Sequence, residues 1–453
     1  MIICHYCFGL PPYKTGGAPM YVNHLIDLQS KSNDVVLLYP GHYRFFRRKS
    51  IVKSGGLYKK DNRIKSFEII NPKPIPICNG ITNIYYYTKN YPIEMWDAFF
   101  SKQKIDVLHI HTLFGLDKNM VESCKKHNIK TIFTTHDLFG ICPKVVPLFK
   151  PICNLRPTDL CSECSKYAFS IKQVRLMQSR LYSIIKNLFL IKLFRRKKLK
   201  QRVANQANIS AINSEKLICL LNNNSKKYSE LQKYYIEIIE SFDCVHFNSS
   251  LSQSVFLERS HPKNSFVKII NNGKIIDRRQ THIKQLDHNL ITFLFLGTGK
   301  GLYEIINCLD DLWQHGMKNF KLVVYSNNDC EYKEFIEKHP AYSIEDEEKI
   351  FNSADCLLLY ETSFASLSFI VLESLSYGLP CITCGDIGAN QVVSETNGGI
   401  VSSKDLFKDT LISVLKDKDL IAKWQDNLKK STFSVFDDDF TAAYRKYLEI
   451  KND

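Results

Sequence analysis

The segment from Ser363 to Thr383, SFASLSFIVLESLSYGLPCIT, carries the clearest fold signal in this chain. Ser366 or Ser368 can cap a helix, because an apolar run follows both of them directly. Gly378 then ends that helix, and a short apolar strand begins at Pro380. A capped helix, a tight turn and a buried strand in this order are typical of a βαβ unit in a parallel sheet.

The same alternation extends along most of the sequence. Helical periodicity is clear at Met20 to Gln29, at Gly301 to Trp313 and at Phe369 to Tyr377. A chain of 453 residues is also longer than one hydrophobic core usually supports. We therefore predict an α/β fold with two doubly wound, Rossmann-like domains. The apolar runs that predict its strands are Val35 to Tyr39, Val107 to Ile110, Thr131 to Thr135, Val245 to Asn248, Thr292 to Leu296, Lys321 to Tyr325, Cys356 to Leu359 and Pro380 to Thr383.

The polar stretch NNGKIIDRRQTHIKQ, from Asn271 to Gln285, marks the predicted domain boundary. We predict a first domain at 1–275, a second at 276–435, and a terminal helix at 436–453 that packs back on the first domain. A helical region rich in Lys and Arg, at about 165–241, is predicted as an insertion in the first domain.

The charge balance favours a negatively charged partner. Lys and Arg number 61 against 46 Asp and Glu, a formal net charge of +15, which suits an anionic ligand, an anionic membrane surface or nucleic acid. No zinc-finger or RNA-recognition signature accompanies the charge, so nucleic acid is not a predicted partner. The start of the chain does not read as a signal peptide. An odd number of cysteines, 15, fits a reducing compartment, and a cytoplasmic location is expected.

Two sites in the first half could carry chemistry. Gly16 and Gly17 stand between the first strand and a helix, where the backbone can approach an anion, although a plain tight turn would use the same residues. His136 and Asp137, in IFTTHDLFGICP, fall just beyond a predicted strand, where side chains point into a ligand crevice. A structural His that caps the next helix is the alternative. His109 and His111 flank a similar strand end and are interpreted as structural.

Two further sites lie in the second half. The amides of Phe369 and Ile370 would open the helix described above and could hold a diphosphate, with Glu373 placed to accept hydrogen bonds from a ribose. A capped helix with one exposed Glu is the alternative interpretation. The loop GTGKG, Gly297 to Gly301, offers flexible backbone and the cation of Lys300 to a phosphate, or else forms a flexible turn.

In this order the motifs resemble family 4 glycosyltransferases of the GT-B fold. The likeness covers nearly the whole chain outside the basic insertion. Four stretches carry it: GGAPMYVNHL, THDLFGICP, GTGKGLYEII, and LSFIVLESLSYGLPCIT with GDIGANQVV behind it. The resemblance implies two Rossmann-like domains that face a central cleft. It also implies transfer of a sugar from a nucleotide donor to an acceptor hydroxyl, with retention and with no metal or other cofactor required.

The resemblance also implies roles for individual residues. His136 would take the place of the active-site histidine, Lys300 would neutralise the departing diphosphate, and Glu373 would hold the ribose. The donor would be a UDP- or GDP-linked sugar, and the acceptor a glycan or a lipid-linked molecule in surface polysaccharide or glycolipid assembly. The donor-binding residues implied are Gly16, Gly17, Gly299, Ser368, Phe369, Ile370 and Glu373.

Two departures from the family pattern leave a second hypothesis open. The family has paired glutamates eight positions apart, but Ala365 stands eight residues before Glu373, and Glu361 could replace the missing carboxylate only in a rearranged loop. The phosphate loop also lacks the Arg that the family places before the Lys. A non-catalytic GT-B protein that binds a nucleotide or a partner glycosyltransferase therefore remains the alternative.

The segment after His136 resembles a subgroup whose HD motif is followed by Cys-Pro and further cysteines. Cys142, Cys153, Cys161 and Cys164 could close a tetrahedral zinc site that holds this loop, or remain free thiols.

The basic insertion contains an apolar stripe at Leu181 to Phe194 and a cationic run at Arg195 to Lys200. This composition suits a helix on the anionic inner face of a membrane, where a lipid-linked acceptor would lie. A solvated helical hairpin is the alternative.

Overall fold

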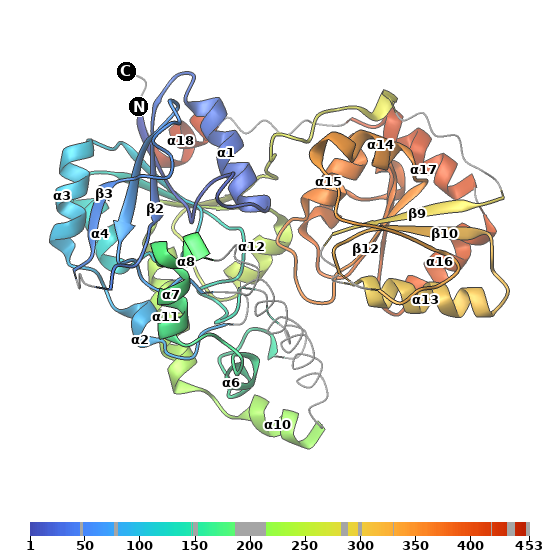
Figure 1. Cartoon of the computed structure of the whole chain (residues 1–453), viewed down its shortest axis with the longest axis horizontal. Coiled ribbons are helices and arrows are strands. Elements are labelled where there is room, and N and C mark those ends of the chain that lie inside the picture. Colours follow the sequence, from blue (N-terminus) through green and yellow to red (C-terminus); the bar gives the residue numbers. More distant parts are fainter. Residues whose placement is uncertain are drawn as a thin grey trace. The chain divides into compact units, whose positions relative to one another are not determined.

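The structure is a computed structural model, and it describes residues 1–45, 49–76, 80–145, 147, 153–185, 214–281, 289–297, 301–328, 330–417, 419–432 and 440–449. The chain forms two compact units. The first contains Met1–Asn248, Gln253–Lys268 and Asp438–Asp453, and the second contains Ser249–Ser252 and Ile269–Asp437. Each unit is built around one sheet (Figure 1).

The first unit has an eight-stranded sheet in the order β3-β4-β2-β1-β5-β6-β7-β8. All neighbours are parallel except β3, which pairs antiparallel with β4 at the sheet edge. Its central strands are buried on both faces, as in a sheet covered by helices on both sides. The strands are β1 Ile2–Tyr6, β2 Asp34–Pro40, β3 Ile51–Ser54, β4 Lys65–Ile70, β5 Val107–Ile110, β6 Lys130–Thr134, β7 Cys244–Phe247 and β8 Ser265–Val267.

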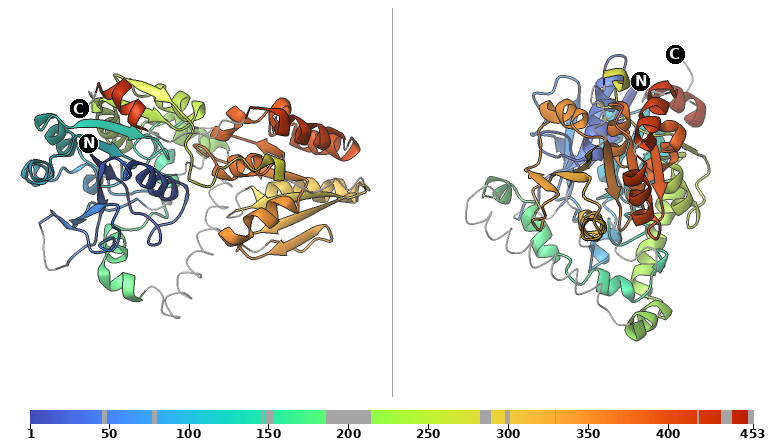
Figure 2. Two further views of the ribbon diagram at one scale, coloured as in Figure 1. Left: turned by 90° about the horizontal axis from the view of Figure 1, so that it is seen from above. Right: turned by 90° about the vertical axis from the view of Figure 1, so that its right-hand side faces the viewer.

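Helices cover this sheet, and one of them comes from the far end of the chain. The helix α18 (Phe440–Leu448) buries Phe440, Tyr444 and Leu448 against the first unit. It is the red helix near the C-terminus in Figures 1 and 2, and it packs against β6, β7 and β8. The other helices are α1 Gly17–Gln29, α2 Tyr85–Thr88, α3 Ile93–Gln103, α4 Lys118–Lys126, α6 Leu160–Cys164, α7 Ile171–Met177, α8 Arg180–Ile185, α10 Ser214–Asn222, α11 Lys226–Ser241 and α12 Ser250–Leu257.

The second unit has a six-stranded, fully parallel sheet in the order β11-β10-β9-β12-β13-β14. Its helix α13 (Leu302–Gln314) buries apolar residues spaced three and four apart, and burial of each such side chain contributes about 1.5–3 kcal/mol. The strands are β9 Ile291–Leu296, β10 Phe320–Tyr325, β11 Ile336–His339, β12 Cys356–Tyr360, β13 Cys381–Cys384 and β14 Gly399–Ser402. The other helices are α14 Glu347–Asn352, α15 Phe369–Ser376, α16 Phe407–Lys416 and α17 Asp419–Lys430.

The predicted fold class, two doubly wound α/β domains, is confirmed. The strand predicted at Val107 to Ile110 is β5, with the same bounds. The strand predicted at Cys356 to Leu359 is β12, which extends one residue further, to Tyr360. The strands β3, β4, β8, β11 and β14 were not predicted, because they lie at or next to a sheet edge, where partly exposed strands carry polar residues that interrupt an apolar run. Among the described helices none is long and apolar enough to cross a membrane.

Candidate functional site

Each sheet has a central strand at which its strand order reverses. In the first sheet β1 lies between β2 and β5, so the chain winds away from β1 in both directions. In the second sheet β9 lies between β10 and β12 in the same way. Open α/β sheets bind ligands outside the carboxyl ends of the strands at such a switch point. The loops that follow β1, β5, β9 and β12 therefore frame one candidate site in each unit.

The loop after β1 ends at the two glycines that open α1. Gly16 has a φ of 119°, a value that residues with a side chain rarely adopt, and a Cβ atom there would meet nothing within 4 Å among the described residues. The helix starts at Gly17, and no described side chain caps it. The first amides of α1 are therefore available to an anion or to water.

His136 and Asp137 follow β6. The half-buried His136 ring lies beside the rings of Tyr21 and His111, with centroids 5.4 and 5.8 Å away. Burial lowers the pKa of His136 to about 3, so the ring is neutral at physiological pH and acts as a hydrogen-bonding group without charge. Asp137 accepts a hydrogen bond from the Phe139 amide, and burial raises its pKa to about 6.

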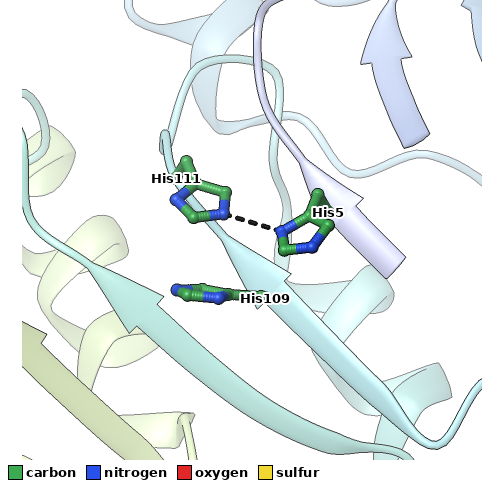
Figure 3. Close-up of side chains that lie close together, drawn as sticks. All are labelled: His5, His109 and His111. Carbon is green, nitrogen blue, oxygen red and sulfur yellow. Dashed lines mark hydrogen bonds between the residues drawn. The ribbon is translucent and has the colours of Figure 1, made fainter. Parts of the chain in front are cut away.

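Three buried histidines lie at the switch point of the first sheet (Figure 3). His5 is on β1, His109 is on β5, and His111 directly follows β5. The His5 Nδ1 and His111 Nε2 atoms are 3.0 Å apart, and the rings of His109 and His111 have centroids 4.0 Å apart. Burial lowers the pKa of His5 to about 4 and the pKa values of the other two well below the ordinary range. All three rings are therefore neutral.

With neutral rings, one directed chain of hydrogen bonds crosses the first unit. It starts at the carbonyl of Lys268, which accepts from Nε2 of His246 at 2.7 Å. Nδ1 of His246 must then accept, and it does so from the Thr134 hydroxyl at 3.0 Å. Thr134 in turn accepts from Nε2 of His109 at 2.7 Å. A single backbone carbonyl thus sets the tautomers of His246 and His109.

The chain continues into α18 and α1 before it returns to the strands. Nδ1 of His109 accepts from the Tyr444 hydroxyl at 2.8 Å, and that hydroxyl accepts from the Gln29 amide nitrogen at 3.1 Å. The Gln29 oxygen accepts from Nε2 of His5 at 2.8 Å. His5 then accepts from His111. Nδ1 of His111 ends the chain as a buried acceptor without a hydrogen-bond partner among the described residues.

The spacing of these rings would suit a metal ion, since the ligand atoms of His5, His109 and His111 lie within 4.8 Å of one another. The hydrogen bonds argue against a metal, because both nitrogens of His5 and His109 are already engaged. Only Nδ1 of His111 keeps an uncommitted lone pair, and a zinc site needs three or four ligands. The hydrogen bonds of the cluster therefore serve to orient the histidine side chains themselves.

Sequence reasoning missed His5, Gln29 and Tyr444, and it interpreted His109 and His111 as structural. A signal existed for the histidines, because the runs ICHY and VLHIH place them at the ends of two adjacent strands. No local pattern could reveal Tyr444, which is 335 residues from His109.

In the second unit, α15 begins beyond the carboxyl end of β12. Ser368 precedes the helix with a φ of 78°, and no described side chain caps it. The amides of Phe369 and Ile370 have no hydrogen-bond acceptor within the described residues. A helix N-terminus with open amides attracts a diphosphate.

Hydrogen bonds with the segment that follows β13 hold the strained turn before α15. The Ala365 amide donates to the Asp386 carbonyl at 2.8 Å, and the Gly388 amide donates to the Ala365 carbonyl at 2.9 Å. A Cβ atom at Gly388 would lie 1.9 Å from the Ser366 carbonyl oxygen, so this close approach requires glycine. The segment GDIGANQVV therefore fixes the position of the α15 amides.

Glu373 lies one turn into α15 and is 5% exposed. Its Oε1 accepts a hydrogen bond from Nδ2 of Asn272 at 2.8 Å. Burial raises the pKa of Glu373, while this hydrogen bond and the nearby Lys274 partly offset the effect. Nζ of Lys274 bonds Glu347 at 2.5 Å. Sequence reasoning did not identify Asn272, which orients the carboxyl group of Glu373.

Ala365, which stands where a second glutamate was expected, and the nearby Glu361 both form contacts with other residues of the second unit. Ala365 forms a β-bridge with Ile387. Oε1 of Glu361 accepts from the amide and the hydroxyl of Ser363, at 2.9 and 2.8 Å. Glu361 therefore stabilises its own turn in this structure.

The loop between β9 and α13 ends at Gly301, which packs against the carboxyl end of β12. A Cβ atom at Gly301 would lie 1.7 Å from the Tyr360 carbonyl oxygen, and Gly301 has a φ of 72°. This contact fixes the end of the loop at the switch point. The predicted residues Gly299 and Lys300 lie outside the described residues.

The four predicted cysteines, Cys142, Cys153, Cys161 and Cys164, line one cavity of about 20 Å³ beside α11. None of them forms a disulfide in the described chain. Burial raises the pKa of Cys161 to about 11 and the pKa of Cys164 to about 12, so both thiols are neutral without a bound cation. The predicted membrane-binding stretch lies outside the described residues except for 181–185.

No protein family model and no curated protein matches this chain. Solved structures do match over nearly their full length. HepE of Anabaena, in complex with UDP-glucose, has a TM-score of 0.54 and 11% identity over 99% of this chain and 98% of that one. A glycosyltransferase from Rickettsia africae ESF-5 has a TM-score of 0.54 and 10% identity over 99% of both chains.

A third similar structure is the α,α-trehalose-phosphate synthase (UDP-forming) of Burkholderia xenovorans, in complex with glucose-6-phosphate. Its TM-score is 0.53, with 12% identity over 98% of this chain and 100% of that one. Identities this low establish the fold alone. This protein therefore has the GT-B fold, with two parallel-sheet α/β units that match those of known glycosyltransferases.

Proposed function

We propose that this protein is a glycosyltransferase that moves a sugar from a nucleotide-activated donor to an acceptor hydroxyl with retention. The observation that carries the proposal is the N-terminus of α15, which leaves the amides of Phe369 and Ile370 open at the switch point of the second sheet. A structure of the same fold contains UDP-glucose, which supports a UDP-sugar or a related GDP-sugar as the donor.

The chemistry of the reaction explains why such a site is useful. Sugar transfer breaks the bond between the anomeric carbon and the diphosphate oxygen, so negative charge grows on the departing diphosphate. Two open amides and the positive end of the α15 dipole stabilise that charge, and Lys300 adds a cation. Preorganised donors of this kind supply much of the rate enhancement in group transfer.

Glu373 binds the nucleotide ribose. Its carboxyl group is buried one turn beyond the open amides, and Asn272 holds it by a hydrogen bond at 2.8 Å. A buried carboxyl that receives only limited compensation favours further hydrogen-bond donors, and the hydroxyls of a ribose supply them.

In the first unit, the candidate ligand-binding residues are His136, Gly16 and Gly17. His136 has its pKa lowered to about 3 and therefore can hydrogen-bond a sugar as a neutral ring. The amides that open α1 suit a phosphate. The acceptor is a glycan or lipid-linked molecule of surface polysaccharide or glycolipid assembly, and the reaction needs no metal.

A matched pair of variants tests the donor site. Proline is well tolerated at the first position of a helix but has no N–H, so Phe369→Pro removes one open amide. Phe369→Ala removes the same side chain and keeps the amide. UDP, GDP and their common sugars are first screened by thermal shift, and the affinity of the best ligand is then measured by calorimetry.

We expect Phe369→Pro to bind the nucleotide at least about tenfold more weakly than Phe369→Ala, because a hydrogen bond to a charged group is worth about 1.5–3 kcal/mol. Equal affinities of the two variants would contradict the proposed donor site. NMR of the product anomer tests retention, and nucleotide binding without turnover over a broad panel would favour the non-catalytic alternative.

A further inference from the structure

A large pocket in the first unit is lined by positive charge. Its volume is about 1140 Å³, and it lies among β3, α2, α3 and the segment that follows β4. No Asp or Glu belongs to its lining within the described residues. Its cationic side chains are Lys49, Lys53, Lys73, Lys89, Lys102 and Arg175.

Most of these cations are not neutralised. Lys73 is used internally, because its buried ammonium group donates to the carbonyls of Tyr87 and Leu116, both at 3.1 Å. The other five form no ion pair within the described residues. Like charges gathered in a concave wall focus the field and attract an anion.

The aromatic lining indicates what the anion is attached to. The guanidinium of Arg175 lies 5.0 Å from the Tyr43 ring centroid and 4.9 Å from that of Tyr86, which fixes its direction. Its Nε is buried and has no hydrogen-bond partner among the described residues. Tyr85 is 57% exposed at the pocket and presents a flat face on which a sugar ring can stack.

Uncharged polar side chains complete the lining and suit the many hydroxyls of a saccharide. A nucleic acid would favour an open groove that follows the backbone, with stacking residues along it. The pocket instead combines rings, amides and hydroxyls in one hollow. These polar residues are Ser50, Ser54, Asn71, Asn90, Gln103 and Asn119.

The lining of the pocket contains none of the candidate donor-site residues of the first unit, Gly16, Gly17 and His136. We propose that this pocket is a second saccharide-binding site, which holds an anionic unit of an extended acceptor chain. The role of the pocket in binding an acceptor rests on the proposed transferase function. The binding of an anionic saccharide to the pocket does not depend on that function.

Direct binding without any donor tests this site. The probes for calorimetry are a galacturonate oligosaccharide and a phosphorylated malto-oligosaccharide, which separate carboxylate from phosphate as the source of charge. The fully methyl-esterified galacturonate is the neutral control. The variants are Lys53→Gln with Lys102→Gln, and Arg175→Met, and the matched control is Lys60→Gln, an exposed lysine outside the pocket.

We expect at least one charged saccharide to bind, and each pocket variant to weaken binding about tenfold while Lys60→Gln does not. Equal binding of the methyl ester, equal binding by the pocket variants, binding of neither saccharide, or preference for a single-stranded oligonucleotide would overturn the proposal. Because nucleotide affinity is measured separately, a failure here is distinct from a failure of the donor site.

A different observation carries a second inference, at the cysteine cavity. The cavity of about 20 Å³ has room for one water or one ion, and four thiols from three segments of the chain line it. The Lys144 amide donates to Sγ of Cys142 at 3.4 Å in the turn Cys-Pro-Lys. Backbone N–H groups that donate to a sulfur in this way stabilise metal thiolates. Cys161 and Cys164 lie on α6, one turn apart.

We propose that Cys142, Cys153, Cys161 and Cys164 bind one structural zinc ion. Within the described residues only the histidine cluster brings three ligand atoms within 4.8 Å, so zinc binding has to draw the sulfur atoms inward. The ion would connect the segment that follows His136 to α6. Gln232 on α11 already joins that segment to the next, by hydrogen bonds to the carbonyls of Ile141 and Leu155.

The zinc content of the full chain, purified without chelator, tests this site. We expect about one zinc per chain by elemental analysis, and loss of zinc in Cys161→Ser and in Cys164→Ser. Cys219→Ser, at an exposed cysteine on α10, is the matched control and keeps the metal. Wild-type protein without zinc after growth in zinc-supplemented medium, or with a Cys161–Cys164 disulfide under reducing purification, would overturn the proposal.

Discussion

The first unit fills its switch point with neutral histidine rings, whereas the second unit leaves open backbone amides at the equivalent place. His5, His109 and His111 satisfy one another through a chain of hydrogen bonds, and only one nitrogen is left over. The amides of Phe369 and Ile370 have no acceptor among the described residues. The same topology thus supports a network of internal polar contacts in the first unit and backbone amides without an acceptor among the described residues in the second.

The largest predicted difference between the two units is in their stability at low pH. The pKa of His5 is lowered to about 4 and that of His246 to about 3, both below the ordinary 6.5, so the unfolded chain takes up protons that the folded chain excludes. The stability of the first unit is therefore fully present above pH 6.5 and falls as the pH drops toward the folded values. Each of these histidines removes about 1.4 kcal/mol per pH unit.

The second unit should resist the same change. Of its described histidines, His315 is exposed and His339 is half-buried, and the raised pKa of Glu373 works in the opposite direction. Pulse-labelled hydrogen exchange after equilibration at each pH measures both units in one sample. Loss of hydrogen-exchange protection at the same pH in β5 and in β12 would contradict the predicted difference in acid stability.

A substitution at Gly301 should damage the second unit selectively. In Gly301→Ala the new methyl group would lie 1.7 Å from the Tyr360 carbonyl and the φ of 72° would be strained, at a cost of about 3 kcal/mol or more. Gly316→Ala has a similar φ of 88° with nothing within 4 Å among the described residues, so it reports the backbone strain alone, about 1 kcal/mol. Urea unfolding followed by proteolysis measures both, and equal losses would exclude the steric contribution.

Removal of one hydroxyl should test the hydrogen-bond chain of the first unit. Tyr444→Phe leaves Nδ1 of His109 and the Gln29 amide without their partner, and a buried unsatisfied group costs about 1–3 kcal/mol. Tyr447→Phe, on the same helix, is the control, because the Tyr447 ring stacks on Phe266 and would lose only an outer hydroxyl. Thermal unfolding should therefore order the variants as wild type, Tyr447→Phe and Tyr444→Phe.

The smallest predicted change in stability is a gain, whereas the changes above are losses. Ser368→Gly relieves a φ of 78° without removing any amide, so it should stabilise the second unit by about 1 kcal/mol and leave nucleotide affinity unchanged. Ser413→Gly, in the exposed part of α16, should instead destabilise by about 0.5–1 kcal/mol. A Ser368→Gly variant that loses stability would show that the side chain has a role beyond its backbone conformation.

The sequence was informative wherever the physical cause was local. Buried parallel strands are short apolar runs, so β5 and β12 could be predicted nearly to the residue. The apolar run and the Gly-Leu-Pro turn likewise identified α15 and Glu373, although no described side chain caps the helix as the two serines predicted. The partner of Glu373 could not be predicted, because Asn272 lies 101 residues away in a polar stretch that reads as a linker.

The helix α18 has a consequence for synthesis on the ribosome. The second unit is nearly continuous in sequence, but the first waits for Phe440 and Tyr444, which emerge after 335 further residues have followed His109. At translation rates of about 5–20 residues per second, the nascent first unit stays unfinished for roughly 20–70 s. The part of the protein that is made first therefore gains its last helix only near the end of synthesis.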